Sequence, residues 1–152
     1  MSVVKIGDSA PDVELRLSSG NLVSLYHLLR ERPVVLFFYP RNNTSVCTKE
    51  ACSFRDAYEE FFAAGATVVG VSANSIESHQ DFAAKHRLPY LLVSDYDGAV
   101  RHAFGISDSL GLIPKRVTFV IDRQGVICQR FRAIFAAERH VQEALAAVRA
   151  LL

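Results

Sequence analysis

The stretch VVLFFY at positions 34–39 is a continuous run of apolar residues, flanked by Pro33 and Pro40. Its β-branched and aromatic side chains favour a strand. An apolar run of this length without polar alternation is typical of a strand buried on both faces. The stretch TVVGV at positions 67–71 has the same character. Two such strands need cover on both faces, which predicts a sheet inside the molecule.

Helices are predicted in the segments between the buried strands. After position 46 the apolar residues change to helical spacing, at Ala51, Phe54, Tyr58, Phe61 and Phe62. Glycine is common just after the end of a helix, so the spacing predicts one continuous helix up to Gly65. The next expected elements are a helix capped by Ser75 that runs to about His86, a strand over Leu91–Val93 and a short helix over Ala99–Phe104.

Both ends of the chain add to this alternating core. Apolar residues alternate with polar ones from Val13 to Leu17, and a turn at Ser19-Gly20-Asn21 leads to Leu22–Leu25, which predicts a β-hairpin. A short helix is expected over Tyr26–Arg30. The last expected elements are a strand over Val117–Ile121, a turn at Asp122–Gly125, a strand over Val126–Phe131 and an amphipathic helix over Glu138–Leu151.

The order of these elements predicts the fold class. Buried strands that alternate with helices indicate an α/β protein with parallel strands and helical cover. A βαβ half followed by a ββα half is the layout of the thioredoxin fold, here with an N-terminal β-hairpin extension. We therefore expect a three-layer α/β/α sandwich with a mixed sheet. The 152 residues suffice for one domain, so we assign residues 1–152 to a single domain.

Composition and charge exclude several classes of function. The formal net charge is +1, from 17 basic and 16 acidic side chains, so there is no basic footprint for a nucleic acid. The apolar stretch 33–40 is far too short to cross a bilayer. Residues 1–10 lack the pattern of a signal peptide. We expect a cytoplasmic protein that binds neither nucleic acid nor membrane.

Cys47 lies where the loop after the first buried strand enters the predicted helix. Helix N-termini carry unpaired N–H groups and the positive end of the helix dipole, which stabilise an anion. A cysteine placed there favours the thiolate, the form that attacks. Thr44 can cap this helix or direct its hydroxyl toward Cys47, and Lys49 adds a positive charge. A buried, inert cysteine is the alternative that position alone leaves open.

Cys52 lies five residues after Cys47. In an intact α-helix, Cα atoms five residues apart are separated by about 8.5 Å, whereas a disulfide needs them within about 7 Å. A Cys47–Cys52 disulfide therefore requires that the start of this helix unwinds. Spacing alone leaves open whether Cys52 takes part in redox chemistry or packs on the core beside Ala51 and Phe54.

Metal binding is disfavoured by the spacing of the possible ligands. The two cysteines form C-x4-C, and no histidine lies close enough to either one to complete a short metal motif. The C-x-x-C of a dithiol reductase is absent.

The five histidines lie mostly on polar helix faces, where we expect them to be exposed. Cys128 lies within a predicted strand and is expected to have no catalytic part.

The segment FFYPRNNTSVCTKEACSFRD, Phe37–Asp56, closely resembles the active-site segment of the Q-type peroxiredoxins, also called bacterioferritin comigratory proteins. Pro40, Thr44 and Cys47 match the family pattern P-x-x-x-T/S-x-x-C, and Cys52 ends the family's C-T-K-E-A-C. The resemblance extends over most of the chain, up to the segment RVTFVID, Arg116–Asp122.

The resemblance implies a role for each matched residue. Cys47 matches the peroxidatic cysteine and Cys52 the resolving cysteine with which it forms a disulfide. Thr44 matches the hydroxyl that hydrogen-bonds the peroxide, and Pro40 the residue that shields the thiolate from water. Arg116 matches the arginine that holds the thiolate and polarises the peroxide, although its residue type and position alone indicate only an exposed charge. Glu50 is expected to help organise the site.

The chain departs from the family pattern just before Cys47. Ser45-Val46 replaces the usual Pro-Gly, and Asn43 stands where the family often has an acidic residue. Neither change removes a reacting group. Val46 lacks the backbone freedom of glycine, which raises the question of whether the loop keeps its geometry.

The resemblance implies a peroxidase that reduces hydrogen peroxide or organic hydroperoxides and is recycled by thioredoxin or a similar dithiol. It implies a monomer that needs no metal, haem or flavin cofactor. One alternative is a binding protein on the same scaffold that senses peroxide through Cys47. A second alternative, a structural interaction module, predicts an unreactive thiol at Cys47.

Overall fold

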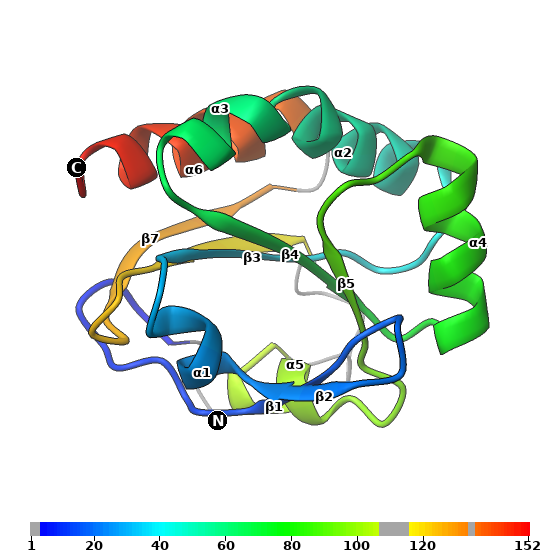
Figure 1. Cartoon of the computed structure of the whole chain (residues 1–152), viewed down its shortest axis with the longest axis horizontal. Helices are drawn as coiled ribbons and strands as arrows, with labels where there is room; N and C mark the ends of the chain where they lie inside the picture. The colour runs from blue at the N-terminus through cyan, green and yellow to red at the C-terminus, as the bar shows by residue number, and fades with distance from the viewer. Residues whose placement is uncertain (1–3, 107–115, 134–135) are drawn as a thin grey trace.

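A five-stranded mixed sheet forms the centre of the computed structural model, which describes residues 4–106, 116–133 and 136–152 (Figure 1). The strand order is β5-β4-β3-β6-β7. β3 pairs in parallel with β4 and β4 with β5, whereas β6 lies antiparallel to both β3 and β7. The strands are β3 Val34–Phe38, β4 Thr67–Ser72, β5 Leu91–Ser94, β6 Val117–Ile121 and β7 Ile127–Arg132.

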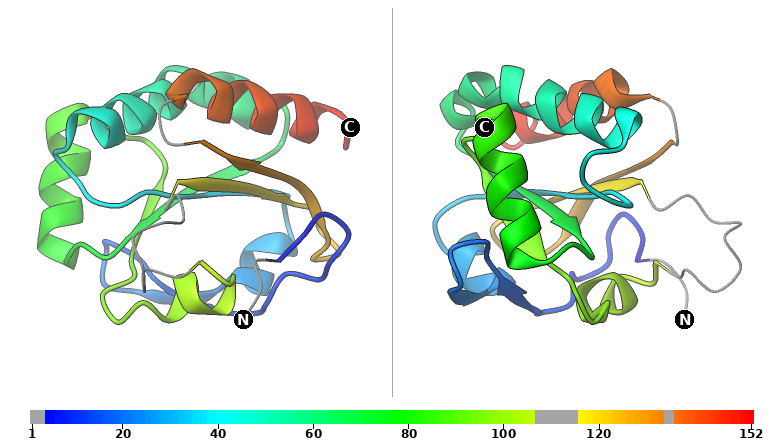
Figure 2. Two further views of the ribbon diagram at one scale, coloured as in Figure 1. Left: turned by 180° about the vertical axis from the view of Figure 1, so that it is seen from behind. Right: turned by 90° about the vertical axis from the view of Figure 1, so that its right-hand side faces the viewer.

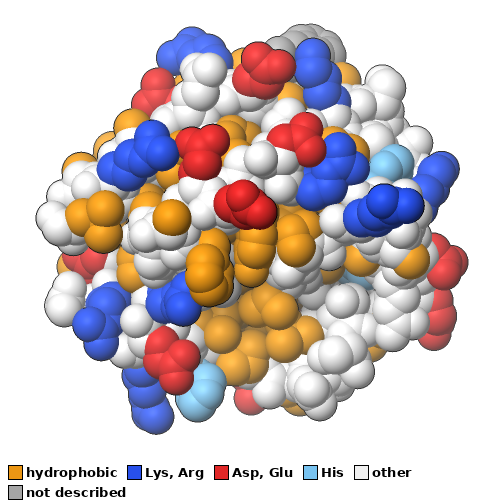
Figure 3. Space-filling model, turned by 45° about the horizontal axis from the view of Figure 1, so that its top comes forward, with side chains coloured by type: hydrophobic (Ala, Val, Ile, Leu, Met, Phe, Trp, Pro, Cys, Tyr) orange, Lys and Arg blue, Asp and Glu red, His pale blue; other side chains and the backbone are white. Residues whose placement is uncertain are grey.

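Further elements cover the two faces of the sheet and complete three layers, as the sequence predicts (Figure 2). One face carries α2 Ser45–Asp56, α3 Tyr58–Ala63 and α6 Ala137–Arg149, with α4 Ile76–His86 beside them. The other face carries α1 Leu25–Leu29, α5 Ala99–Ala103 and the hairpin of β1 Glu14–Arg16 and β2 Leu22–Ser24. Acidic and basic side chains are interspersed on the helical face, in keeping with the net charge near zero (Figure 3).

β3 serves both halves of the core because its side chains alternate between the two faces. Val35 and Phe37 pack in the cluster under α2 and α6, whereas Leu36 and Phe38 pack in the cluster under α1 and α5. The neighbouring strand has no room for a side chain opposite Phe37, since a Cβ on Gly70 would lie 2.8 Å from that ring. The C-terminal end of β3 is thereby fixed in place, and the loop to α2 starts from it.

The N-terminal extension covers an edge of the sheet. The Ser18 amide donates to the Leu92 carbonyl at 2.9 Å, and Leu17 forms an isolated antiparallel bridge with Val93. These contacts occupy backbone groups of the edge strand β5, which would otherwise be available to pair with another chain. β1 and β2 pair in antiparallel fashion, with Leu15 opposite Val23, so the predicted hairpin is confirmed.

The prediction of one continuous helix up to Gly65 is wrong, because the segment forms two helices that meet at Ala57. Ala57 has φ −94° and ψ 5°, and it caps both helices. Its amide donates to the Ser53 carbonyl, and its own carbonyl accepts from the amides of Glu60 and Phe61. The break leaves these backbone groups satisfied, so it costs little. The other elements begin and end within about two residues of the predicted positions.

Candidate active site

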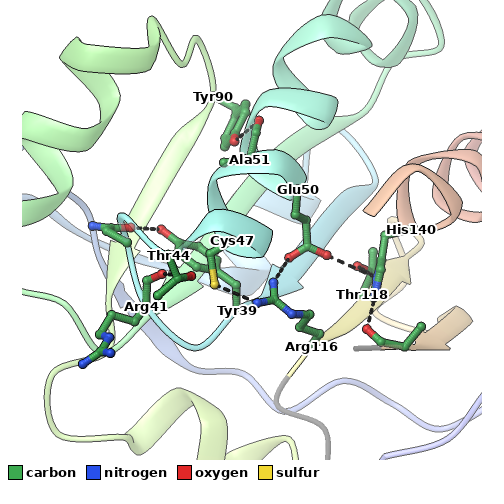
Figure 4. Close-up of polar contacts among 12 residues, drawn as sticks. Tyr39, Arg41, Thr44, Cys47, Glu50, Ala51, Tyr90, Arg116, Thr118 and His140 are labelled. Carbon is green, nitrogen blue, oxygen red and sulfur yellow. Dashed lines mark hydrogen bonds and ion pairs between the residues drawn. The ribbon is translucent and has the colours of Figure 1, made fainter. Parts of the chain in front are cut away.

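Cys47 lies in the first turn of α2, directly after the loop that follows β3 (Figure 4). Thr44 is the N-cap residue by position, and Cys47 is the third residue of the helix. The side chain of Cys47 is fully buried. Cys47 is therefore buried at the start of a helix, where unpaired amides and the helix dipole stabilise an anion.

Arg116 provides the positive charge that faces the sulfur atom. It directly precedes β6, and the register that pairs Phe38 with Val117 places it beside the end of β3. Its Nη2 atom lies 3.0 Å from Cys47 Sγ, and the residue is only 7% exposed. The interpretation of Arg116 as an exposed charge is therefore wrong. A buried guanidinium needs an anionic partner, and the thiolate of Cys47 is in position to be that partner.

Glu50 extends the site behind Arg116. Its Oε1 atom lies 3.5 Å from Arg116 Nη1, and the residue is 1% exposed. Burial raises the pKa of Glu50 to about 8, although Arg116 opposes this rise. The raised pKa favours the protonated carboxyl, which leaves the charge of Arg116 available to the sulfur atom.

His140 of α6 and Thr118 of β6 close the site on the side away from Cys47 (Figure 4). His140 Nδ1 lies 2.8 Å from Thr118 Oγ1 and 3.5 Å from Glu50 Oε2. Its Nε2 atom lies 2.9 Å from the Ala133 carbonyl oxygen. Burial lowers the pKa of His140, which favours a neutral imidazole.

Thr44 and Pro40 lie on the loop between β3 and α2. The Thr44 hydroxyl donates to the Arg41 carbonyl at 3.2 Å and makes no cap hydrogen bond, so of the two roles that the sequence leaves open for it, the side-chain cap is not found. The helix-start amides are thus left to other partners. Pro40 is exposed. The roles in peroxide binding and thiolate shielding that the resemblance gives to these two residues stay predictions.

The loop geometry does not depend on a glycine before Cys47. Val46 lies within the first turn of α2, where its backbone is helical. The positive φ of this loop belongs to Asn43, at 65°. Asparagine tolerates this left-handed conformation better than most residues. The chain therefore accommodates Ser45-Val46 without backbone strain at either position.

A second buried polar network supports the same loop from the side of α4. Asn42 accepts a hydrogen bond from the Tyr39 hydroxyl at 2.7 Å, and its own side-chain amide lies 3.2 Å from His79 Nδ1. The backbone amide of Asn42 donates to Asn74 Oδ1 at 2.9 Å. His79 Nε2 lies 3.4 Å from Ser72 Oγ. These bonds connect the loop before Cys47 to β4 and α4.

The expectation that the histidines are mostly exposed is wrong for His79 and His140, which are fully buried. The sequence does contain a signal for one of them. His140 is four residues before Ala144 and eight before Val148, both buried on the same face of α6. Helical spacing thus places His140 on the apolar face, where a polar side chain needs specific partners.

Cys52 lies in the same intact helix as Cys47, and all three cysteines are free thiols. Cys52 is partly exposed. The adjoining part of α2 is held from outside the helix, because the buried Tyr90 hydroxyl donates to the Ala51 carbonyl at 2.7 Å. The Arg55 guanidinium likewise donates to the His86 carbonyl at 2.8 Å. The Cys47–Cys52 disulfide stays a prediction.

Cys128 lies far along the sheet from Cys47. It belongs to the start of β7, which pairs with the end of β6 opposite to Arg116. Its Sγ atom lies 3.5 Å from the Val126 carbonyl oxygen, and burial raises the pKa of its thiol. This geometry separates Cys128 from the site, as predicted.

Within residues 4–106, 116–133 and 136–152, no three His, Cys, Asp or Glu side chains group as a possible metal site. In the same part of the chain, no helix has the length and apolar character needed to cross a membrane. The expected absence of a metal cofactor stays a prediction.

Residues 6–130 match the model of the AhpC/TSA family. The chain is 43% identical over 146 residues to the chloroplastic peroxiredoxin Q of Sedum lineare, which covers 95% of this chain and 78% of that protein. The chain belongs to the AhpC/TSA family. The resemblance to the Q-type peroxiredoxins is thus confirmed.

Solved structures of this family share the fold. Peroxidoxin BcpB of Mycobacterium tuberculosis is 39% identical and has a TM-score of 0.90, with 98% of this chain and 99% of that one covered. A bacterioferritin comigratory protein of Xanthomonas campestris, described for its alkyl peroxide reduction activity, is 31% identical with a TM-score of 0.82. That likeness covers 99% of both chains. The prediction of a thioredoxin fold is confirmed by these peroxiredoxin structures.

Proposed function

We propose that the chain is a thiol-dependent peroxidase in which Cys47 reduces hydroperoxides. One observation carries the proposal: Arg116 Nη2 lies 3.0 Å from the buried Cys47 Sγ at the start of α2. A guanidinium at this distance stabilises the thiolate, which is the nucleophile. The membership of the AhpC/TSA family and the peroxiredoxin Q relatives support the same activity.

In the first step the Cys47 thiolate attacks the terminal oxygen of the peroxide. A sulfur–oxygen bond forms, the oxygen–oxygen bond breaks, and the leaving alkoxide takes the proton that the thiol gave up. Cys47 becomes a sulfenic acid. Arg116 and the helix-start amides stabilise the charge that develops on the two oxygens, and the Thr44 hydroxyl joins them once it turns from the Arg41 carbonyl. Pro40 shields the thiolate from water.

In the second step Cys52 resolves the sulfenic acid. Its thiol attacks the sulfur of Cys47, a Cys47–Cys52 disulfide forms and water leaves. The start of α2 has to unwind, because positions five apart in a helix are too distant for a disulfide. The bonds from Tyr90 to Ala51 and from Arg55 to His86 have to adjust to this motion or limit it.

In the third step an external dithiol, thioredoxin or a similar protein, reduces the disulfide by exchange. This chemistry requires no metal, haem or flavin. The alkyl peroxide reduction described for the X. campestris protein supports organic hydroperoxides as substrates alongside hydrogen peroxide. We further expect a monomer that acts in the cytoplasm, although curated relatives are named as chloroplastic.

The proposal is tested by NADPH consumption with hydrogen peroxide, thioredoxin and thioredoxin reductase. The wild type should sustain turnover, and Cys47→Ser should show none. Cys52→Ser should still oxidise Cys47 once but should not be recycled by thioredoxin. Cys128→Ser serves as the matched control and should keep full activity. Normal steady-state turnover by Cys52→Ser would exclude Cys52 as the resolving residue.

The alternative of a peroxide sensor makes a different kinetic prediction. A sensor oxidises Cys47 once and slowly, whereas a peroxidase turns over repeatedly and fast. The buried Arg116–Cys47 contact favours the peroxidase, because it stabilises the nucleophile before any peroxide arrives. A single oxidation of Cys47 without turnover, with thioredoxin and other dithiols alike, would favour the sensor.

A further inference from the structure

The second oxygen of the Glu50 carboxyl, Oε2, is buried in the site, and the reaction of Cys47 with peroxide gives it no role. Glu50 Oε2 is buried and has no hydrogen-bond partner among the described residues. His140 Nδ1 lies 3.5 Å from it. A buried polar atom without a partner is costly, so this contact calls for a proton that turns it into a hydrogen bond.

The contacts of His140 determine where its own proton lies. Its Nε2 atom lies 2.9 Å from the Ala133 carbonyl oxygen, which can only accept, so Nε2 carries the hydrogen. Nδ1 then has a lone pair, to which the Thr118 hydroxyl donates at 2.8 Å. An ionised Glu50 would direct an acceptor oxygen at this lone pair. One additional proton between Glu50 Oε2 and His140 Nδ1 removes the conflict.

We propose that Glu50 Oε2 and His140 Nδ1 share one proton, and that His140 is thereby a positioning residue that keeps the Arg116 guanidinium on Cys47. The inference rests on the peroxidase function proposed above. With the shared proton the Glu50–His140 pair is neutral, and Arg116 directs its charge at the sulfur atom. Once the proton is lost, the Glu50 carboxylate competes with the thiolate for Arg116.

The distances around Arg116 agree with the protonated pair. Its contact with Cys47 Sγ is 3.0 Å, whereas its contact with Glu50 Oε1 is 3.5 Å. A carboxylate in full competition would draw a guanidinium to a shorter distance. The directions of the pKa changes agree as well, because burial raises the pKa of Glu50 to about 8 and lowers that of His140.

The surroundings of the pair supply few other charges. Arg116 and Cys47 face it from the start of β6 and from α2, and the hydroxyl of Tyr39 in the neighbouring core interacts electrostatically with both Cys47 and Glu50. β7 contributes the ring of Phe131, edge-on to His140 at 4.7 Å between centroids. Arg139 of α6 lies against the Phe131 ring, at 5.1 Å from its centroid. The shared proton therefore acts mainly on Arg116.

The test is the rate of Cys47 oxidation in a single turnover with hydrogen peroxide, followed from about pH 5 to about pH 10. The variant His140→Phe keeps a ring against Phe131 but removes Nδ1, the acceptor of the Glu50 proton. Its rate at neutral pH should fall about tenfold, because Glu50 then ionises at lower pH and its carboxylate competes with the thiolate for Arg116. Its decline on the alkaline side should begin at lower pH than in the wild type.

Glu50→Gln provides a second variant with a permanently neutral side chain. Its amide can donate to His140 Nδ1 while its carbonyl accepts from Arg116, as the protonated carboxyl does. It should lose the alkaline decline of the rate. In this background His140→Phe should change the rate by less than about twofold. His102→Phe, which alters an exposed histidine, is the control and should match the wild type.

Two results would overturn the inference. The first is a wild-type rate and pH profile for His140→Phe. The second is an equal fall in rate when His140→Phe is introduced into the wild type and into the Glu50→Gln variant. A wild type that does not react with peroxide would instead reject the proposed function itself. The two kinds of failure are thus distinct, since the first kind requires a reactive wild type.

Discussion

His79 and His140 are both fully buried, and their contacts give both the same neutral form, yet their surroundings differ. His79 of α4 contacts neutral groups, among them the Asn42 amide at 3.2 Å and Ser72 Oγ at 3.4 Å. His140 of α6 contacts Thr118 and, at 3.5 Å, a carboxyl oxygen that has no other partner among the described residues. Burial lowers the pKa of each histidine.

The difference separates a network that supports the site from one that tunes it. The bonds of His79 fix the loop before Cys47, and they involve groups that do not titrate near neutral pH. The bonds of His140 lead through Glu50 and Arg116 to the sulfur atom, and this path contains charges. Satisfied neutral networks rigidify a fold, whereas incompletely satisfied charged ones mark chemistry. We therefore expect changes near His79 to affect stability and changes near His140 to affect the reaction.

The largest effect is expected from Arg116→Met, which removes the charge that the His140 network directs at Cys47. The rate of Cys47 oxidation by peroxide should fall about 10²- to 10³-fold, as for the loss of other preorganised charge-stabilising groups. Stability should change much less, because Glu50 can remain protonated. Stopped-flow oxidation kinetics and urea unfolding measure the two quantities.

Arg123→Met is the matched control for this variant, because Arg123 follows the other end of β6 and donates to the Arg30 carbonyl. Its peroxide rate should equal that of the wild type. A similar loss of rate in both variants would contradict the assignment of the charge effect to Arg116.

The second prediction concerns Glu50→Gln and the pH dependence of stability. The folded-state pKa of Glu50, about 8, lies above its usual value of 4.5. A group of this kind contributes stability that is full below about pH 4.5 and is lost as the pH rises through about 8. At about 1.4 kcal/mol per pKa unit, the loss reaches at most about 5 kcal/mol.

Urea unfolding at about pH 5 and about pH 9 measures this loss. Between these values the wild type should lose several kcal/mol of unfolding free energy relative to Glu50→Gln, whose side chain does not titrate. Equal pH dependence in the two proteins would show that Glu50 is ionised throughout. The proposed difference between the His79 and His140 networks, which depends on the titration of Glu50, would then be rejected.

The third prediction is that His79→Leu reduces stability by about 2 kcal/mol, because it removes the buried contacts of His79 with the Asn42 amide and with Ser72 Oγ. The shape of the pH profile for peroxide should stay that of the wild type. Urea unfolding and single-turnover kinetics provide both readouts. His102→Leu, at an exposed position, should change stability by less than about 0.5 kcal/mol.

The strands and most helices could be predicted from the sequence because their signals are local. VVLFFY carries its strand signal within six positions, and Ser75 caps α4 through its bond to the Ser78 amide, as expected. The break at Ala57 could not be predicted, since alanine is a good helix former. The break depends instead on hydrogen bonds in which Ala57 serves both helices.

The site was predictable only where the residues lie close together in the sequence or match a known family. Cys47 and Thr44 lie in one loop-to-helix segment, and Arg116 was identified only through the family resemblance. The Glu50–His140 contact joins residues far apart in the sequence, on α2 and α6. No local pattern encodes such a contact, because it exists only once both helices pack on the same face of the sheet. Helical spacing could at most have indicated that His140 is buried.

The smallest effects are expected from a pair of variants that each remove one hydroxyl near a buried histidine. Thr118→Val removes the donor to His140 Nδ1, and Ser72→Ala removes the hydroxyl beside His79 Nε2. Each should cost about 1 kcal/mol in urea unfolding. Only Thr118→Val should move the alkaline decline of the peroxide rate, and it should move it upward.

The upward direction follows from competition for one lone pair. The Thr118 hydroxyl and the Glu50 proton both seek His140 Nδ1, so removal of the hydroxyl leaves the nitrogen to Glu50 and strengthens the shared proton. Arg116 then stays on Cys47 to a higher pH, with a change in rate below about threefold at neutral pH. His140→Phe moves the same decline downward. Thr118→Val and His140→Phe should therefore shift the pH of this decline in opposite directions, and Ser72→Ala should not shift it. A general loss of packing does not produce this pattern.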